Sequence, residues 1–301
     1  MIPPLDANTQ LYLADLGRIS DRMQRAQRQM ATGKRVNSVS DDPGSVTPLL
    51  ETRSSLEAVQ QINMNLGRVK TEVDSATTGL ESAVTIMERV QVLGSQGITD
   101  TQTADSRAAI ATELGSLLEQ LGGIARTNVE GRYVFSGDSD QTVPYNIDLT
   151  QADPIGTYAG SAATREIQHP NGTRFSVALT AQTIFDAPDP SDNVFHAVND
   201  LRVALQNNDV PGINTALQQV TTAGAYLNRQ LAVYGTAQNK VADAIDYGSK
   251  LTLQLQSEAS TYEDADLTSA IVEFQQAQTQ QQAALMVHSK MPRSSLFDYL
   301  A

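Results

Sequence analysis

The chain has 301 residues, of which 40% are hydrophobic, 18% charged and only 5% aromatic, and its net charge at pH 7 is −13. An acidic chain of this length lacks the basic surface that nucleic-acid binding requires, and the absence of cysteine excludes disulfides and cysteine-ligated metals. So few aromatic residues disfavour one large globular core and suit long helices packed through Ala, Leu, Val and Ile.

The first helix is predicted from heptad spacing near the N-terminus. Apolar residues step by four and three positions along one face, a coiled-coil pattern that we call a seam: Tyr12, Leu16, Ile19, Met23, Ala26 and Met30. Gly33 follows and is the residue type that most often ends a helix. Residues 1–40 carry a net charge of +3 and the remainder −16. A solvated helix face explains this basic segment, and docking on acidic neighbours is the alternative.

Two more helices follow a loop at residues 34–42. Asp42 and Pro43 predict the cap and first position of a helix that runs from about 44 to 93. Its seam alternates steps of three and four without a break: Val59, Ile62, Leu66, Val69, Val73, Ala76, Leu80, Ala83, Met87 and Val90. Residues 94–103 interrupt the pattern, and a third helix, ending near Gly131, carries Ile110, Leu114, Leu117, Leu121 and Ile124.

Residues 131–190 differ from the helical segments in composition and pattern, and they predict a small inserted β domain. Gly, Pro, Asp and Asn separate short β-prone runs, at 132–135, 142–145, 156–158 and 174–179. The sequence His-Pro-Asn-Gly at 169–172 predicts a turn between two strands, because Asn-Gly favours tight hairpins.

Helical periodicity returns after residue 190 and continues to the C-terminus. Val194, Val198, Leu201 and Leu205 predict one helix, and a long seam from Ile213 towards Leu255 predicts the next. A restart at 263–266 precedes a last helix, which Pro292 interrupts, with the seam Leu267, Ile271, Phe274, Gln278, Gln281, Leu285 and His288. Six of the eight residues 275–282 are Gln, which suits burial between subunits or a polar solvent-exposed face.

The layout predicts a mainly α protein with a small inserted β domain. Residues 1–40 and 264–301 would form paired terminal coiled-coil helices, 41–130 and 191–263 a long antiparallel helical bundle or rod, and 131–190 an outer β domain. The terminal pair is thin, so we expect it to order when many copies pack. The expected assembly interface consists of Tyr12, Leu16, Ile19, Met23, Met30, Leu267, Ile271, Phe274, Leu285 and Leu296.

No catalytic, cofactor or metal constellation is found, which predicts that the chain is not an enzyme. The three histidines lie in separate segments without metal-ligand spacing: His169, His196 and His288. Asp41 and Asp42 could bind a cation, but helix capping explains Asp42 better. Asp138 and Asp140 lack the further oxygen ligands of a calcium loop. We also expect no cleaved signal peptide and no membrane span, because no apolar segment is suited to either.

Three stretches resemble flagellin-like axial proteins, and in particular the hook–filament junction proteins of that family. They are QMATGKRVNSVSDDPG at 29–44, GRYVFSG at 131–137, and the C-terminal stretch from Asp266 to Leu300, which ends in SSLFDYL. Filament flagellins usually have alanines after the paired aspartates, where this chain has Pro43 and Gly44. The first ten residues also depart from the usual start of junction proteins.

The resemblance implies a structural subunit of the bacterial flagellum, exported through the flagellar type III channel without a cleaved signal. It implies an adaptor ring of identical copies between the first hook-associated protein and the flagellin filament. A flagellar export chaperone would bind the C-terminal helix before secretion. The terminal helices would line the inner tube, and the β domain would face outwards.

Three alternatives remain open at this point. The chain could be a filament flagellin proper, which abundance and deletion would distinguish from a junction subunit. It could be a coiled-coil sensor or secreted effector, although the former usually has a membrane span. An enzyme housed in the insert would depend on Asp138, Asp140 and Asp153 alone.

Overall fold

The computed structural model describes residues 7–290, and the chain forms two compact units. The terminal unit contains both chain ends, up to Ala58 and from Thr252, and the central unit is Val59–Leu251. Each unit is described by itself. The predicted Leu296 and Pro292, the SSLFDYL motif and residues 1–6 lie outside the described residues.

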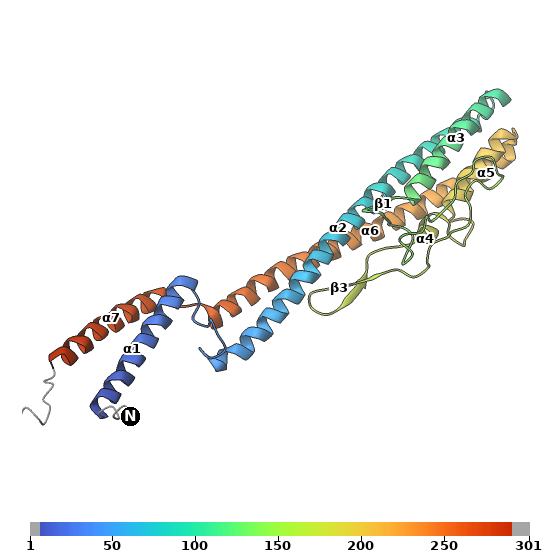
Figure 1. The fold of residues 1–301 in the computed structure, drawn as a ribbon. Helices are drawn as coiled ribbons and strands as arrows, with labels where there is room; N and C mark the ends of the chain where they lie inside the picture. The colour runs from blue at the N-terminus through green and yellow to red at the C-terminus, as the bar shows by residue number, and fades with distance from the viewer. Residues whose placement is uncertain (1–6, 291–301) are drawn as a thin grey trace, which may run out of the picture. The chain divides into compact units, whose positions relative to one another are not determined.

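The terminal unit is built from α1 (Ala7–Thr32), α7 (Leu267–Lys290), the start of α2 (Pro43–Gly97) and the end of α6 (Val210–Glu263) (Figure 1). Gly33 ends α1 with φ of +70°, a conformation that suits glycine. Asp266 caps α7, because its Oδ1 accepts the N–H groups of Thr268 and Ser269 at 2.9 and 3.2 Å. The predicted start of the second helix at Pro43 is confirmed.

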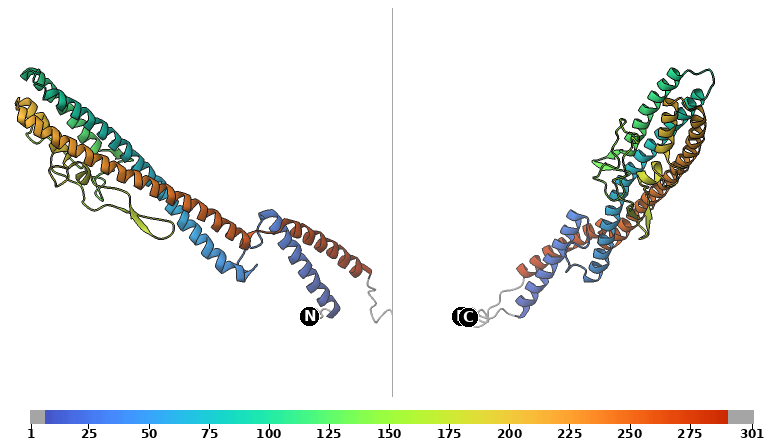
Figure 2. Two further views of the ribbon diagram at one scale, coloured as in Figure 1. Left: turned by 180° about the vertical axis from the view of Figure 1, so that it is seen from behind. Right: turned by 90° about the vertical axis from the view of Figure 1, so that its right-hand side faces the viewer.

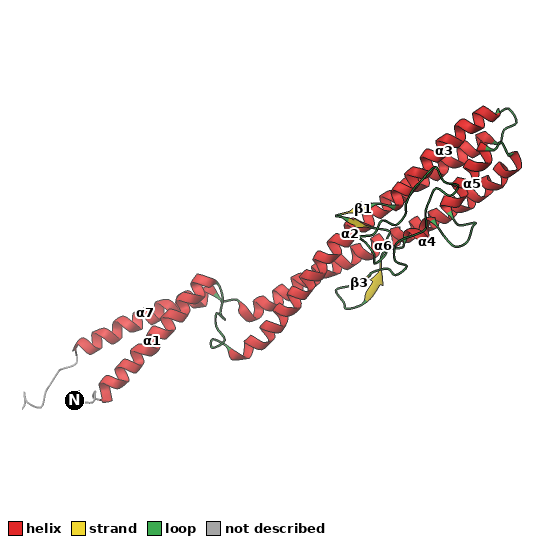
Figure 3. Cartoon of the chain, turned by 45° about the vertical axis from the view of Figure 1, so that its right-hand side comes forward, coloured by secondary structure: helices red, strands yellow, loops and turns green. Residues whose placement is uncertain are grey.

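The central unit is a helical bundle with one continuous apolar core. α3 (Ala104–Ala125) and α5 (Val194–Gln206) lie beside the long helices α2 and α6, as the views in Figures 2 and 3 show. The predicted seam supplies the α2 side of this core, where Ala76, Leu80, Ala83 and Val90 are fully buried. A hydrogen bond from Gln238 of α6 to Asp74 of α2, at 2.9 Å, crosses the same contact.

The insert contains two short antiparallel hairpins and one short helix, α4 (Ala181–Phe185). β1 (Asn128–Val129) pairs with β2 (Arg132–Tyr133), and β3 (Glu166–Gln168) pairs with β4 (Arg174–Ser176) in the register Ile167 opposite Phe175. The predicted turn at 169–172 is confirmed: Gly172 has φ of +91°, and its N–H donates to the carbonyl of His169 at 2.9 Å.

Two predicted strands are wrong, and the third helix is shorter than predicted. Residues 142–145 and 156–158 form no strand, and this part of the insert has a single bridge between Ile147 and Ile155. The first run contains Pro144, which cannot donate to a ladder, and the second begins with Gly156, a residue type that disfavours strands. The third helix ends at Ala125 instead of near Gly131, because β1 begins three residues later and turns through Glu130 and Gly131 at positive φ.

Aromatic packing holds the insert on the bundle. Phe135 contacts Phe185 and Tyr234, and Tyr145 contacts Phe195, with ring centroids 5.3–6.1 Å apart. Tyr234 of α6 also exchanges hydrogen bonds with Leu179, accepting from its N–H at 3.1 Å and donating to its carbonyl at 3.3 Å. Several of the chain's few aromatic residues therefore lie at the contact between the insert and the bundle, where the insert has little regular strand structure.

Candidate assembly surface and elbow

The predicted α1 seam is the least exposed face of α1, and it packs against α7. Tyr12, Leu16, Ile19, Met23 and Met30 are all partly buried, and Ala26 between them is fully buried. The helices run antiparallel and lie side by side in the views of Figures 1 and 2. The prediction that the two ends of the chain pair is confirmed.

The α7 face that meets α1 is made mainly of small residues. Ala270 and Ala277 are buried and Ala284 is partly buried, and these three alanines recur every seven residues. Phe274 and Gln281, on the same side of α7, are partly buried. Small side chains bury little area, so the pair gains little hydrophobic stabilisation from its own contact.

Apart from Phe274, the large apolar residues of α7 are exposed outside this contact. Leu267, Ile271 and Leu285 are 48%, 46% and 53% exposed, and the neighbouring Val272, Met286 and Val287 are exposed as well. The seam predicted for the last helix is therefore only partly turned towards α1. Phe274 and Gln281 are partly buried and His288 contacts Tyr12, whereas the leucines and isoleucine of the seam are exposed. We call this outward-facing set of Leu267, Ile271, Val272, Leu285, Met286 and Val287 the apolar face of α7. The Gln-rich stretch is mostly exposed, with Gln281 the exception.

Two polar contacts fix how α1 and α7 align. The ring of Tyr12 stacks on that of His288, with centroids 4.2 Å apart and an interplanar angle of 10°. Arg22 Nε lies 3.2 Å from Glu273 Oε1, and Arg22 also donates to the side chain of Gln280 at 3.4 Å. The first contact lies near one end of the pair and the second nearer its middle, so together they set its register.

The links next to this pair are joined by backbone hydrogen bonds. The N–H of Arg35 donates to the carbonyl of Glu263 at 2.7 Å, and the N–H of Ala265 donates to the carbonyl of Gly33 at 2.9 Å. We call this region, residues 33–42 and 263–266 with Arg53, the elbow. The segment after α1 therefore runs beside the segment before α7 for two to three residues.

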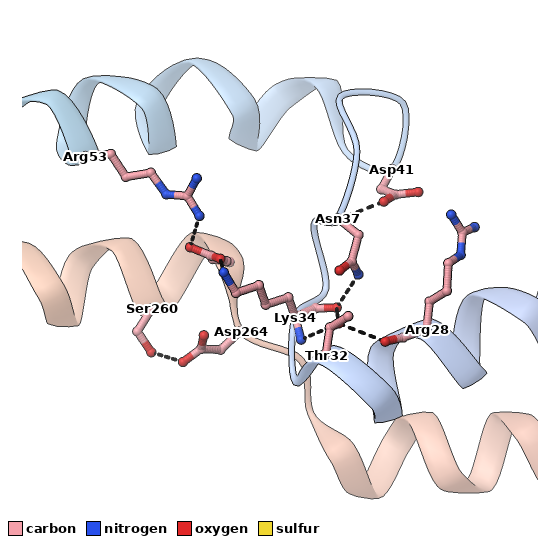
Figure 4. Close-up of polar contacts among 9 residues, drawn as sticks. Arg28, Thr32, Lys34, Asn37, Asp41, Arg53, Ser260 and Asp264 are labelled. Atoms are coloured by element: carbon pink, nitrogen blue, oxygen red, sulfur yellow. Dashed lines mark hydrogen bonds and ion pairs between the residues drawn. The ribbon is translucent and has the colours of Figure 1, made fainter.

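Glu263 places a buried carboxylate at the centre of the elbow. The residue is 8% exposed, and its carboxylate pairs with Lys34 and with Arg53, whose Nη2 lies 2.5 Å from Oε2. Figure 4 shows Lys34 and Arg53 approaching from different segments. Burial alone would raise the pKa of Glu263, but the two cations outweigh burial and hold it below its usual value.

The remaining acidic residues of the elbow are used locally. Asp42 accepts from Ser45 and from Arg35 at 2.6 Å, and these contacts lower its pKa to about 2. Asp41 Oδ2 accepts the N–H groups of Asn37 and Ser38 at 3.0 and 2.8 Å. Burial works against ionisation of Asp41, yet these bonds keep its pKa lowered. Asp41 and Asp42, which the sequence offered as a possible cation site, are thus used locally. Asp42 caps α2, and Asp41 stabilises the loop that precedes it.

Outside the elbow, the described residues offer few groupings of side chains that could bind a metal ion or catalyse a reaction. Within residues 7–290 no group of three or more His, Asp or Glu side chains is placed to hold a metal ion. Asp140 lies near Arg132, 3.5 Å away, while Asp138 donates its backbone N–H to the carbonyl of Ala163. Across the same described range, no helix has the length and apolar character needed to cross a membrane.

Comparison with known proteins places this arrangement in a family. Residues 7–140 match the model of the bacterial flagellin N-terminal helical region, and residues 213–300 match that of the bacterial flagellin C-terminal helical region. The flagellar hook-associated protein 3 of Escherichia coli K12 is 26% identical over 294 residues, covering 89% of this chain and 90% of that protein. Flagellin FlaB1 of Treponema pallidum is 20% identical over 288 residues, covering 95% and 94%.

A solved structure has the same fold. A protein from Vibrio parahaemolyticus, described as a flagellar hook-associated protein, superposes with a TM-score of 0.65 at 21% identity. The match covers 74% of this chain and all of that one. At this identity the likeness establishes the fold alone.

Proposed function

This chain belongs to the bacterial flagellin family, whose members are structural components of the flagellum, and we propose that it is the subunit that joins the hook to the flagellin filament. The higher identity to a hook-associated protein 3 than to a flagellin of similar length favours this role over that of a filament flagellin, which is the second candidate. The function is thus mechanical: many copies must pack into a joint between two different axial structures.

The apolar face of α7 is the observation that carries the proposal. An isolated helix pair of this thinness is marginal in water, and it leaves several large apolar side chains exposed on one helix. Helices from neighbouring copies would cover these side chains. The residues of the terminal seams, Leu16 and Phe274 among them, therefore serve in this proposal as the assembly interface.

The proposal assigns a role to each part of the chain. Residues 1–40 and 264–301 form the inner terminal-helix domain, 41–130 and 191–263 the rod, and 131–190 the outer domain. The partners are other copies of the chain in a ring, the first hook-associated protein, and flagellin. An export chaperone binds the C-terminal helix, and the chain leaves the cell through the flagellar export channel without a cleaved signal.

Labelling of intact flagella tests this function. The chain has no cysteine, so Asn171→Cys in the exposed β3–β4 turn provides a single site for a fluorophore. We expect one short labelled band just beyond the hook, and deletion of the protein should leave hooks intact while flagellin is lost to the medium. Label along the whole filament would support the flagellin alternative, and filaments of normal length on the deletion strain would contradict the junction role.

A further inference from the structure

The two links of the elbow come from opposite ends of the chain, yet they are held by the same residue. The N-terminal link connects α1 to α2, and the C-terminal link connects α6 to α7. Glu263 contributes its carbonyl to the N–H of Arg35, while its carboxylate contacts Lys34 of the N-terminal link and Arg53 of α2. One residue therefore joins the end of α6 to the N-terminal link and to α2.

The position of Glu263 is unfavourable without these partners. It is the last residue of α6, where the negative end of the helix dipole disfavours a carboxylate, and it is almost fully buried. A buried carboxylate of this kind needs cations and hydrogen bonds to remain charged. The buried carboxylate of Glu263 in turn attracts Lys34 and Arg53, whose side chains are each about half exposed.

No other carboxylate of the described elbow replaces it. Asp264, the next residue, is exposed and accepts from Ser260 on its own helix. Asp42 pairs with Arg35, and Asp41 braces the N-terminal link through backbone N–H groups. Arg35 adds a bond from its guanidinium to the carbonyl of Tyr262 at 2.8 Å, so a third cation faces the end of α6.

We propose that Glu263 is the positioning residue of the elbow: through Lys34 and Arg53 it locks the two links together, so that α1 and α7 are held or released as one unit before copies assemble. This deepens the proposed function, on which its meaning for assembly rests. A helix pair with a weak contact of its own needs such a lock, because otherwise either helix could fray alone and the apolar face of α7 would be presented without α1.

Hydrogen exchange of the purified monomer tests the lock directly. Glu263→Gln removes the charge at nearly constant volume, and Asp264→Asn is its matched control, with the same change of charge one residue away. We expect Glu263→Gln to lower the protection of both the Arg35 and the Ala265 amides by about tenfold or more, together, while the amides of α3 keep theirs. Asp264→Asn should leave all of them unchanged.

A second variant distinguishes loss of the lock from a local folding defect caused by the substitution at residue 263. Arg53→Gln leaves both links intact in sequence and removes only the cation from α2, so it should also expose both amides, to a smaller extent. The proposal is overturned if Glu263→Gln affects the Ala265 amide alone, if Asp264→Asn has an equal effect, or if Arg53→Gln has none.

The outcome for the lock is independent of the outcome for the junction role. Exchange is measured on the monomer, whereas the junction role depends on the labelled band beyond the hook. A normal band for the Asn171→Cys protein, lost when Glu263→Gln is added but not when Asp264→Asn is added, would link the two. Coupled exchange without any such band would retain the lock and reject the proposed function.

Discussion

The apolar face of α7 allows a quantitative prediction about assembly. Ile271 and Leu285 are each about half exposed in the single subunit. Complete burial of such a side chain contributes about 1.5–3 kcal/mol, so the exposed half leaves about 1 kcal/mol per residue to be gained on contact. The double variant Ile271→Gln with Leu285→Gln should therefore lose about 2 kcal/mol, which corresponds to a roughly 30-fold weaker association.

The substitution is chosen to spare the monomer. Leu and Gln have similar helix propensities, and exposed substitutions usually change stability by less than about 0.5 kcal/mol. Sedimentation at increasing protein concentration measures self-association, and circular dichroism during urea unfolding measures stability. The control is Val92→Gln on α2, a residue of the central unit with similar exposure, 48%. Unchanged association of the double variant, or an equal loss in the control, would refute the reasoning.

Three further predictions concern stability. Arg107 is buried and donates to the carbonyls of Gly97 and Thr99 at 2.8 and 3.2 Å and to Asn208 Oδ1 at 2.6 Å. Arg107→Met should therefore cost about 2–4 kcal/mol in urea unfolding, against little for the exposed Arg126→Met. Gly137 has φ of +62°, and a Cβ there would lie 2.2 Å from the carbonyl oxygen of Ser161. Gly137→Ala should lower the unfolding free energy by at least about 2 kcal/mol, and more than Gly131→Ala, which has positive φ but open space. Finally, the pKa of Glu263 is lowered in the folded chain. Its contribution to the free energy of unfolding is therefore present above the pKa of the unfolded chain, about 4.3, and is lost as pH falls through the pKa of the folded chain. In Val39→Cys alone, a fluorophore at this site should gain mobility at acid pH, below the ordinary range of a glutamate, whereas in Val39→Cys with Glu263→Gln it should already be mobile at pH 7.

The helices could be predicted from sequence because their spacing has only one structural solution over long stretches. The unbroken α2 seam and the restart near 263–266 each correspond to an observed element within a few residues. The insert was harder, since short β-prone runs depend on tertiary partners. There, aromatic contacts such as Phe135 with Phe185 organise the chain in place of a continuous ladder.

The orientation of α7 could not be predicted, because its sequence contains two seams side by side. One has Leu267, Ile271 and Leu285, and the other has the three alanines at 270, 277 and 284. Periodicity alone favours burial of the larger residues, whereas close approach to α1 selects the smaller ones. The Glu263 contact was also missed, although a glutamate at the end of a long helix, where the dipole disfavours it, was a usable signal.

The alanine-lined contact of α7 has one more consequence. Large side chains that insert between those of a partner helix fix the axial position of both, whereas a row of alanines presents a nearly smooth track. Sliding α7 along α1 by one heptad would bring Ala270 to the place of Ala277, so the contacts of the alanines alone would change little, although Phe274 would move to the place of Gln281. Tyr12 with His288, Arg22 with Glu273 and Gln280, and the backbone hydrogen bonds of the elbow oppose such a shift. The axial position of α7 on α1 is therefore set by these contacts and not by the alanine packing.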